Sequence, residues 1–186
     1  MSAPSASALP APGRALPGRS QKMQVAETHV VSGNPTMAPF PVGLDSIMFG
    51  MGCFWGAERL FWRLPGVFST QVGYAGGLTP NPNYEEVCTG MRQHADLGSQ
   101  YRSVIFTSSA EQQQVALQSK EVYQQELLSR GLGSITTHIS ELTLFFYAED
   151  HHQQYLKKTP KGTCPMKGTG VSCPLGPEAQ DQSDGL

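Results

Sequence analysis

Short apolar runs of strand length alternate with segments of helical period along the middle of the chain, and this alternation constrains the fold more than any other feature. A strand-like run at 46–49 leads through a glycine-rich turn into a helical pattern at 54–63, and further strand-like runs lie at 67–74 and 102–107. Alternating strands and helices in so short a chain favour two packed layers over a helical bundle. We therefore expect a two-layer α/β or α+β sandwich.

The later part of the chain continues the pattern. The expected elements are a short helix at 84–88, a helix ending at Arg130, a hairpin or bent strand formed by 135–139 and 142–147, and a last helix at 149–158. Ser108 with Glu111 forms a capping-box pattern that opens the long helix.

The chain length and the composition of its two ends predict one folded domain with flexible termini. The sequence has 186 residues, 39% of them hydrophobic, which is enough for one core. Residues 1–44 are rich in Ala, Pro, Ser and Gly without hydrophobic periodicity, so we expect a mobile arm. The folded domain is expected at 45–160, and 161–186 is expected to be a flexible tail rich in Gly and Pro.

Charge and hydropathy exclude several classes of partner. The net charge of −2 arises without long blocks of either sign, so we expect no nucleic-acid binding. No run of about 18 apolar residues and no secretory signal is present, so we expect no membrane insertion and a cytoplasmic protein. Residues 1–26 loosely resemble an organelle transit peptide, although their prolines break the required helix. The nucleus and the mitochondrion therefore stay open as compartments.

Cys53 lies at the turn between the first expected strand and the first expected helix. The free backbone N–H groups and the dipole of a helix N-terminus favour an anion, and the thiolate is the nucleophilic form of cysteine. Phe54 and Trp55 follow the sulfur and are suited to form an apolar wall for a substrate methyl group. The alternative is that Cys53 is an inert core residue beside two ordinary core aromatics.

Further motifs favour the reactive cysteine. The run Gly50-Met51-Gly52-Cys53-Phe54-Trp55-Gly56-Ala57-Glu58 resembles the signature of the peptide methionine sulfoxide reductase A family, with the vertebrate enzymes as the nearest likeness. The resemblance extends from about Met23 to Gly176 through Thr70-Gln71-Val72-Gly73-Tyr74-Ala75-Gly76-Gly77, Asn81-Pro82-Asn83-Tyr84, Gly98-Ser99-Gln100-Tyr101-Arg102-Ser103, Ala148-Glu149-Asp150-His151-His152-Gln153-Gln154-Tyr155-Leu156 and Gly168-Thr169-Gly170-Val171-Ser172-Cys173-Pro174. It implies an α+β, ferredoxin-like fold with a mixed sheet.

The resemblance also implies a mechanism. Cys53 would attack the sulfur of methionine-S-sulfoxide and become a sulfenic acid. Tyr84, Tyr101 and Asp96 match the polar pocket residues of the family, although Ala95 replaces the usual Asn beside Asp96. Phe54 and Trp55 would hold the substrate methyl group. Glu58 and Arg59 are interpreted as a solvated helix face.

Two tail cysteines complete the relay that the resemblance implies. Cys164 would resolve Cys53, Cys173 would resolve Cys164, and an external dithiol of the thioredoxin kind would reduce the resulting disulfide. No bound cofactor is implied, the substrates are oxidised proteins or peptides, and we expect a monomer. A zinc site built from the tail cysteines and nearby histidines is the competing explanation, but the close paired spacing of structural zinc ligands is lacking. Cys88 is interpreted as a buried bystander.

One strand-helix unit of the family pattern is missing. In the family, a strand with a Gly-His-x-Glu pattern, a helix and a loop follow the position of Cys88, whereas here only Thr89 separates Cys88 from Gly90. The absent glutamic acid helps to protonate the sulfoxide oxygen. Asp96 in His94-Ala95-Asp96 does not replace it, because its distance from Tyr101 assigns it to another pocket position. We interpret the gap as an internal deletion, for example from alternative splicing.

Three functions are compatible with these residues. The first is reduction of methionine-S-sulfoxide at a full or diminished rate. The second is a non-catalytic, poorly folded product that retains a reactive thiol or binds partners, because an unpaired sheet edge would expose apolar surface. The third is general thiol redox chemistry on peroxides or disulfides. A comparison of R and S sulfoxides distinguishes the first from the third.

Overall fold

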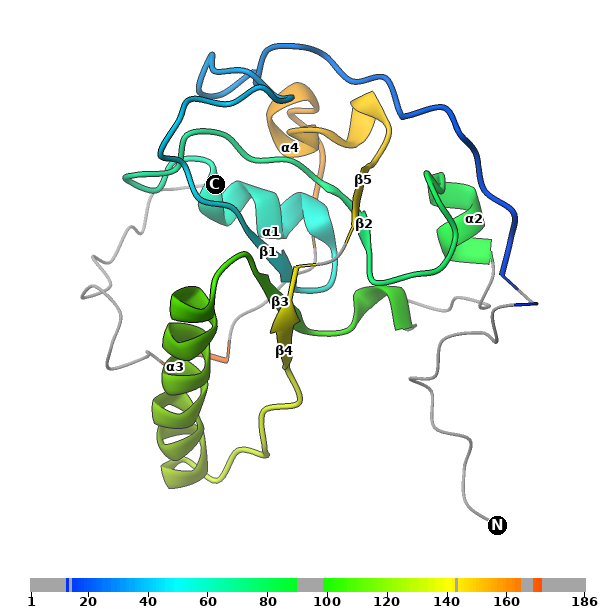
Figure 1. Ribbon diagram of the computed structural model, residues 1–186. Helices are drawn as coiled ribbons and strands as arrows, with labels where there is room; N and C mark the ends of the chain where they lie inside the picture. The colour runs from blue at the N-terminus through cyan, green and yellow to red at the C-terminus, as the bar shows by residue number, and fades with distance from the viewer. Residues whose placement is uncertain (1–12, 14, 90–98, 143, 165–168, 172–186) are drawn as a thin grey trace.

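A three-stranded mixed sheet organises the computed structural model (Figure 1). β1 (Ile47–Gly50) runs antiparallel to β3 (Val104–Thr107), and β3 runs parallel to β4 (His138–Glu141). The structure describes residues 13, 15–89, 99–142, 144–164 and 169–171. Within these ranges β1 has a strand partner on one edge only.

A second, two-stranded sheet is separate from the first. β2 (Gly73–Ala75) pairs antiparallel with β5 (Phe145–Tyr147), so that Gly73 lies opposite Tyr147. A Cβ atom on Gly73 would lie 2.2 Å from the Phe146 carbonyl oxygen, which explains the glycine. The expected hairpin is wrong, because β4 and β5 belong to different sheets. The apolar pattern of the sequence indicated approximately where strands form, but it could not indicate which strands pair with each other.

Helices flank the two sheets. They are α1 (Phe54–Phe61), α2 (Tyr84–Thr89), α3 (Ala110–Ser129) and α4 (Tyr155–Lys158), with the short 3₁₀ turns η2 (Ser99–Tyr101) and η3 (Asp150–His152). The single helix expected at 149–158 is wrong, because Gln154 adopts a left-handed conformation between η3 and α4. No helix in the described ranges is both long and apolar enough to cross a bilayer. The α+β class is confirmed, and the ferredoxin-like arrangement stays a prediction.

The capping of α3 differs from the expectation by one residue. Ser109, not Ser108, is the N-cap, and its hydroxyl accepts a hydrogen bond from the Gln112 backbone N–H at 3.1 Å. Ser108 instead donates its hydroxyl to the Ser46 carbonyl at 2.7 Å, which ties the start of α3 to the residue before β1. The helix then packs on β3 and β4 and lies beside the mixed sheet (Figure 1).

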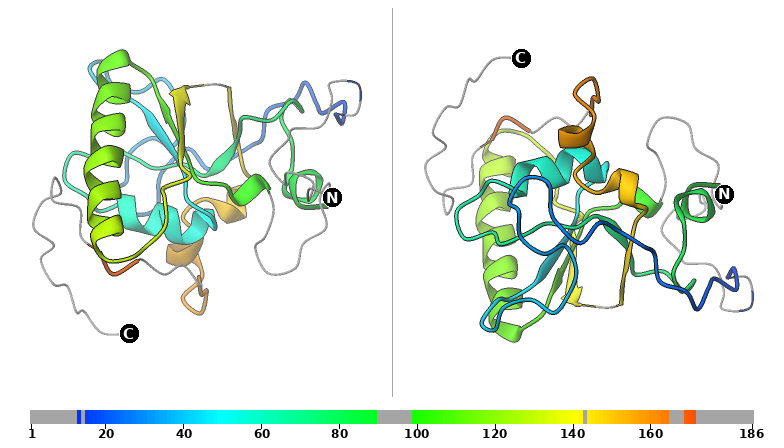
Figure 2. Two further views of the ribbon diagram at one scale, coloured as in Figure 1. Left: turned by 90° about the horizontal axis from the view of Figure 1, so that it is seen from below. Right: turned by 90° about the horizontal axis from the view of Figure 1, so that it is seen from above.

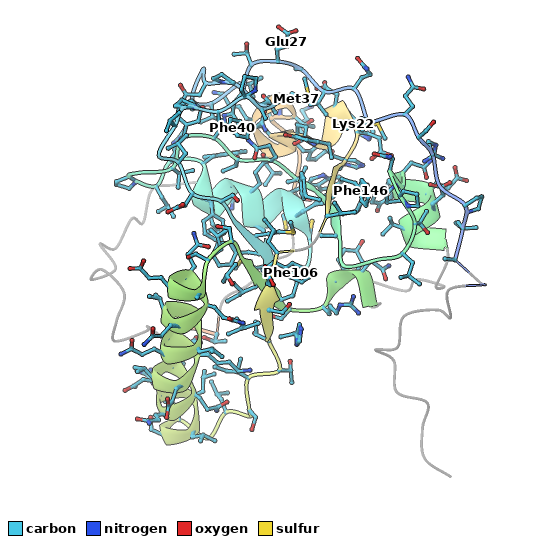
Figure 3. The ribbon with its side chains drawn as sticks, in the orientation of Figure 1. Lys22, Glu27, Met37, Phe40, Phe106 and Phe146 are labelled. Atoms are coloured by element: carbon cyan, nitrogen blue, oxygen red, sulfur yellow. The ribbon has the colours of Figure 1, made fainter. Side chains whose placement is uncertain are left out.

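The core lies where α1 meets the strands. Its buried apolar residues include Ala57 and Trp62 at α1, Phe106 of β3, and Val72 and Ala148 at the ends of the second sheet. In the view of Figure 3, Phe106 of β3 lies below α1, and Phe146 lies in β5 of the second sheet. At the N-terminal end of α1 the Phe54 ring lies 6.1 Å from the Tyr74 ring of β2, and Cys53 directly precedes Phe54 there.

Part of the N-terminal segment is packed against the body, which the composition did not indicate. Val25, His29 and Thr36 are buried, and the Ala26 backbone N–H donates to Asp150 Oδ1 at 2.6 Å. The segment crosses the face that carries α1 and α4 (Figure 2), and Glu27 points away from the body (Figure 3). Its anchors are polar and backbone groups, so it has no hydrophobic periodicity. The mobility of 1–44 as a whole stays a prediction.

Candidate active site

Cys53 is the N-cap residue of α1. Its backbone is extended (φ −62°, ψ 115°), and its carbonyl accepts the Ala57 N–H at 3.3 Å. Gly52 before it has φ +85°, a conformation that side chains other than glycine rarely adopt. The glycine turn therefore places the Cys53 side chain at the N-terminal end of the helix.

The electrostatic environment of Cys53 combines opposing effects. Burial raises the pKa of the thiol, the backbone N–H groups of Trp55 and Gly56 lower it, and the Cys164 side chain raises it. The net shift of the Cys53 pKa is upward. The helix acts in the expected direction, but desolvation is the larger effect.

The Cys164 side chain lies near enough to Cys53 to interact with its thiol, and this interaction raises the Cys53 pKa. Both cysteines are half-buried free thiols. The chain reaches this position through a turn after α4, in which the Gly162 N–H donates to the Thr159 carbonyl at 2.8 Å. A Cβ atom on Gly162 would lie 2.9 Å from the Tyr155 ring, so glycine permits the close return of the chain.

Aromatic rings surround the residues that follow Cys53. The Trp55 indole stacks on Tyr155 with ring centroids 3.9 Å apart, and its Nε1–H donates to His152 Nδ1 at 3.0 Å. The Phe54 ring lies 5.2 Å from the His152 ring and 6.1 Å from the Tyr74 ring. Two large aromatic side chains are thus held in fixed positions beside the thiol.

His152 is buried and neutral in this arrangement. Burial and the neighbouring His151 lower its pKa, against the opposite effect of Glu149. Because Nδ1 accepts the indole hydrogen, the ring hydrogen is assigned to Nε2. That buried Nε2 has no hydrogen-bond acceptor among the described residues, and Glu149 Oε2 lies 3.9 Å from it.

A pocket of about 480 Å³ opens beside this cluster. Its lining residues are Trp55, Asn83, Tyr84, Glu85, Glu149, His151, His152 and Tyr155. Tyr84 is held here by its backbone N–H, which donates to Glu149 Oε1 at 2.7 Å, while the Tyr74 hydroxyl donates to Glu149 Oε2 at 3.0 Å. Burial alone would raise the pKa of Glu149, but these hydrogen bonds and one from its own backbone N–H bring it below its usual value.

The helix that begins at Tyr84 is fixed by a reciprocal cap. The Glu86 N–H donates to Asn83 Oδ1 at 2.8 Å, and the Asn83 N–H donates to Glu86 Oε2 at 3.0 Å. The Arg19 guanidinium binds both oxygens of Glu86 at 2.8 Å. The N-terminal segment therefore also contacts the element that carries Tyr84.

The structure brings together only part of the predicted site. Trp55 and Tyr84 line the pocket, and Cys53 interacts with Cys164 at the N-terminal end of α1. Neither Cys53, Phe54 nor the half-buried Tyr101 is among the described pocket residues. Asp96 and Cys173 lie outside the described residues, and the side chain of Cys88 is not described.

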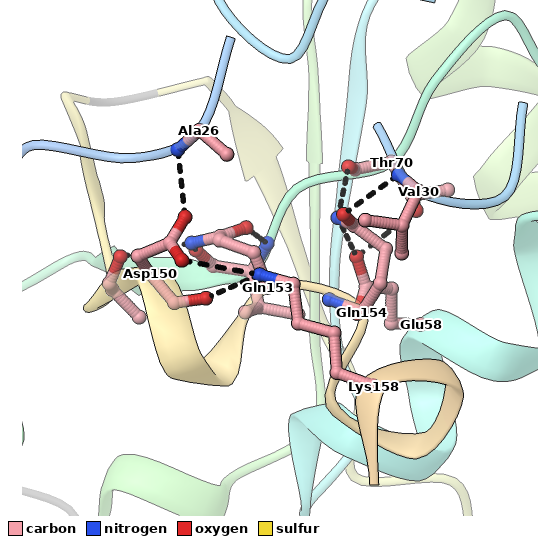
Figure 4. Close-up of polar contacts among 10 residues, drawn as sticks. Ala26, Val30, Glu58, Thr70, Asp150, Gln153, Gln154 and Lys158 are labelled. Atoms are coloured by element: carbon pink, nitrogen blue, oxygen red, sulfur yellow. Dashed lines mark hydrogen bonds and ion pairs between the residues drawn. The ribbon is translucent and has the colours of Figure 1, made fainter. Parts of the chain in front are cut away.

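Glu58 was wrongly assigned to a solvated face. It is 5% exposed, whereas Arg59 is exposed as expected. Its carboxylate accepts hydrogen bonds from the Gln154 backbone N–H and Nε2 at 2.8 Å and from the Thr70 hydroxyl at 3.0 Å (Figure 4). Its position three residues after Trp55, on the same side of the helix, was the available signal. Glu149, His152 and Tyr155 were also missed as individual site residues.

We expect the pH dependence of stability to report on Glu58. Burial is the main reason that its pKa rises from 4.5 to about 7, against its three hydrogen bonds and Lys158. A raised carboxyl pKa favours the folded state fully below pH 4.5, and this contribution is lost as the pH rises to about 7, by about 3 kcal/mol. Urea unfolding from pH 4.5 to 8 should show this decline in the parent chain, and Glu58→Gln should flatten it. An equally steep decline in the variant would contradict this assignment.

Comparison with known proteins places this geometry in a family. The profile of the family described as "Peptide methionine sulfoxide reductase" matches residues 45–96 and 89–174. The chain belongs to the peptide methionine sulfoxide reductase family. Peptide methionine sulfoxide reductase MsrA 1 of Synechocystis is 50% identical, with 92% of this chain and 93% of the relative aligned. The MsrA enzyme of Brucella melitensis is 48% identical, with 90% and 93% aligned.

A solved structure of this reductase family agrees. Methionine sulfoxide reductase A of Corynebacterium diphtheriae is 37% identical, with a TM-score of 0.75 over 89% of this chain and 98% of the other. The protein is thus an oxidoreductase of the methionine sulfoxide reductase class, whose members repair oxidised methionine with thiol reductants and without a metal. In the described residues no group of three His, Cys, Asp or Glu could hold a metal ion.

The match to this reductase family is interrupted. The alignment to the Synechocystis enzyme covers 206 positions, which exceeds the 186 residues of this chain by 20, so at least 20 of its positions have no counterpart here. The two segments matched by the family profile overlap at residues 89–96. This is the region where the sequence predicts the missing strand-helix unit.

Proposed function

We propose that Cys53 reduces methionine-S-sulfoxide, free or in proteins, with Cys164 as its resolving thiol. The observation that carries the proposal is that Cys164, a free and half-buried cysteine, interacts with the free Cys53 at the N-terminal end of α1. A resolving thiol has to reach the sulfur of the nucleophile, and two free cysteines from distant parts of the chain meet here. A buried structural cysteine needs no such partner.

The proposed reaction proceeds in balanced steps. The Cys53 thiol gives up its proton and the thiolate attacks the sulfoxide sulfur. The oxygen takes up that proton and ends on the Cys53 sulfur as a sulfenic acid, while methionine leaves. The Cys164 thiol then attacks the sulfenic sulfur, which forms a disulfide and releases water. Cys173 attacks this disulfide at Cys164 and frees Cys53. A thioredoxin-like dithiol reduces the disulfide between Cys164 and Cys173 and is itself oxidised to a disulfide.

The aromatic pocket supplies the substrate contacts. Phe54 and Trp55 are proposed to hold the methyl group, supported by their fixed positions beside Cys53. The hydroxyls of Tyr84 and Tyr101 are proposed to donate hydrogen bonds to the sulfoxide oxygen, and Asp96 is proposed as a further polar residue of the pocket.

The chain is further proposed to turn over slowly because a strand-helix unit has been deleted after Cys88. Support comes from the two overlapping family matches and from β1, which in the described residues has a partner on one edge only. The lost glutamic acid would have served as a general acid, which contributes about 10² to 10⁴ in rate. We propose that this variant acts as a cytoplasmic monomer.

The test compares both epimers of a methionine sulfoxide peptide with dithiothreitol as reductant. We expect slow reduction of the S epimer, no reduction of the R epimer, and no turnover in Cys53→Ser. Cys88→Ser is the matched control and should retain the parent rate. Equal rates on both epimers would indicate general thiol chemistry, and the absence of turnover in a folded parent would reject the proposal in favour of a non-catalytic product.

A further inference from the structure

Glu58 is the most buried carboxylate in the part of the chain that the structure describes, and the proposed reaction does not use it. It lies on α1 one turn after Trp55 and does not line the pocket. Figure 4 shows its carboxylate directed at Gln154 and Thr70. A buried carboxylate needs hydrogen-bond partners, so the partners of Glu58 indicate its role.

Every described partner of the Glu58 carboxylate is a donor. His29 Nδ1 accepts the backbone N–H groups of Val31 and Ser32 at 3.3 and 3.1 Å, so its Nε2 carries the ring hydrogen. His29 Nε2 donates this hydrogen to Thr70 Oγ1, and the two atoms are 2.8 Å apart. The Thr70 hydroxyl hydrogen is then free to be donated to Glu58. Together with the two donors of Gln154, this bond favours the ionised carboxylate of Glu58, against the burial that raises its pKa.

The carboxylate holds Gln154 in an unusual backbone conformation. Gln154 has φ 48° and ψ 40°, in the left-handed region that residues other than glycine rarely adopt. Glu58 binds both its backbone N–H and its side-chain amide at 2.8 Å. Two separate bonds to one residue fix the reversal of direction between η3 and α4.

This reversal positions His152 and Tyr155, the two residues that contact the Trp55 indole. His152 precedes Gln154 and accepts the indole N–H at 3.0 Å, while Tyr155 follows it and stacks on the indole at 3.9 Å. Trp55 and Glu58 lie three residues apart on α1 and so face the same segment. Each contacts a different part of residues 152–155.

We propose that Glu58 is a positioning residue of the substrate pocket, which holds Gln154 in its left-handed conformation and thereby sets Trp55 between His152 and Tyr155. The consequence for substrate binding rests on the proposed function, in which Trp55 contacts the substrate methyl group. The positioning of Trp55 does not depend on turnover and is measured separately.

The experiment uses the full chain with Trp62→Phe, which leaves Trp55 as the only tryptophan. Acrylamide quenching of Trp55 fluorescence is measured in this parent and with Glu58→Gln, whose amide brings a donor against donors. Arg59→Gln, at the neighbouring exposed position, is the matched control. We expect Glu58→Gln to increase the quenching constant at least about twofold and Arg59→Gln to leave it unchanged. Unchanged quenching in folded Glu58→Gln would overturn the proposal.

A second pair of variants tests the backbone conformation and does not require Glu58→Gln to fold. Gln154→Gly and Gln154→Ala lose the same side-chain bond, but only glycine adopts the left-handed conformation readily. Gln154→Gly should retain parent quenching, whereas Gln154→Ala should show the increase. Equal quenching in these two variants would also overturn the proposal.

Kinetics separate this inference from the proposed function. Loss of the Trp55 position should raise KM for the S-sulfoxide peptide about tenfold and change kcat less, because a ground-state contact is lost. Altered quenching with an unchanged KM would support the positioning by Glu58 and reject the substrate role of Trp55. Circular dichroism confirms that each compared variant is folded at the assay temperature.

Discussion

Inserting the segment that the Synechocystis relative carries between the positions of Cys88 and Gly90 will raise the turnover of methionine-S-sulfoxide by about 10² to 10⁴ fold. The segment restores the glutamic acid that the family resemblance places there as a proton donor to the sulfoxide oxygen. It also restores a strand to a sheet in which β1 is paired only with β3 among the described residues. The restored proton donor and the restored strand should both raise the rate, because a paired strand also holds its glutamic acid in place.

The measurement is kcat/KM on an S-sulfoxide peptide for the parent and the restored chain. A Gly/Ser linker of equal length is the matched control for added length, and it should leave the rate at the parent value. Replacing the inserted glutamic acid by glutamine separates proton donation from structural repair. A restored chain that is folded but no faster than the linker control would contradict the deletion as the cause of slow turnover.

The sequence predicted local structure well where one residue or one turn determines it. The helix expected from Phe54 begins there in the structure, because the glycine turn and the apolar period define the same boundary. The strand expected at 102–107 contains β3. The partners of the strands were not predictable, because the apolar pattern of β4 and β5 is the same whether they pair with each other or with β3 and β2.

The candidate site shows the same division. Its cysteine and aromatic residues were indicated by type and spacing, whereas the groups that hold them were not. The sequence pattern indicates a solvated position for Glu58, because its partners Gln154 and Thr70 lie far from it along the chain. His29 lies in a segment whose composition indicates disorder, yet it is fully buried and its ring is hydrogen-bonded on both nitrogens. Long-range polar contacts leave no period in a sequence, so only the folded structure reveals them.

Gln153 is a similar case, with a larger expected effect on stability. It is 1% exposed, and its side-chain amide binds Val72 as a backbone strand would. Oε1 accepts the Val72 N–H at 3.0 Å, and Nε2 donates to the carbonyls of Val72 and Ala148 at 2.9 and 2.8 Å. Val72 and Ala148 directly extend the pairing of β2 with β5, so one side chain completes the end of that sheet.

Replacing Gln153 by leucine will therefore lower the free energy of unfolding by about 3 to 5 kcal/mol, since the Val72 N–H and the Ala148 carbonyl lose their partner without access to water. In a chain of this size the melting temperature should fall by about 6 to 20 °C. Gln114→Leu on the exposed face of α3 is the matched substitution and should change stability by about 0.5 kcal/mol or less. Thermal melts followed by circular dichroism measure both variants. If Gln153→Leu and the Gln114→Leu control have the same melting temperature, this end of the second sheet contributes little to the stability of the fold.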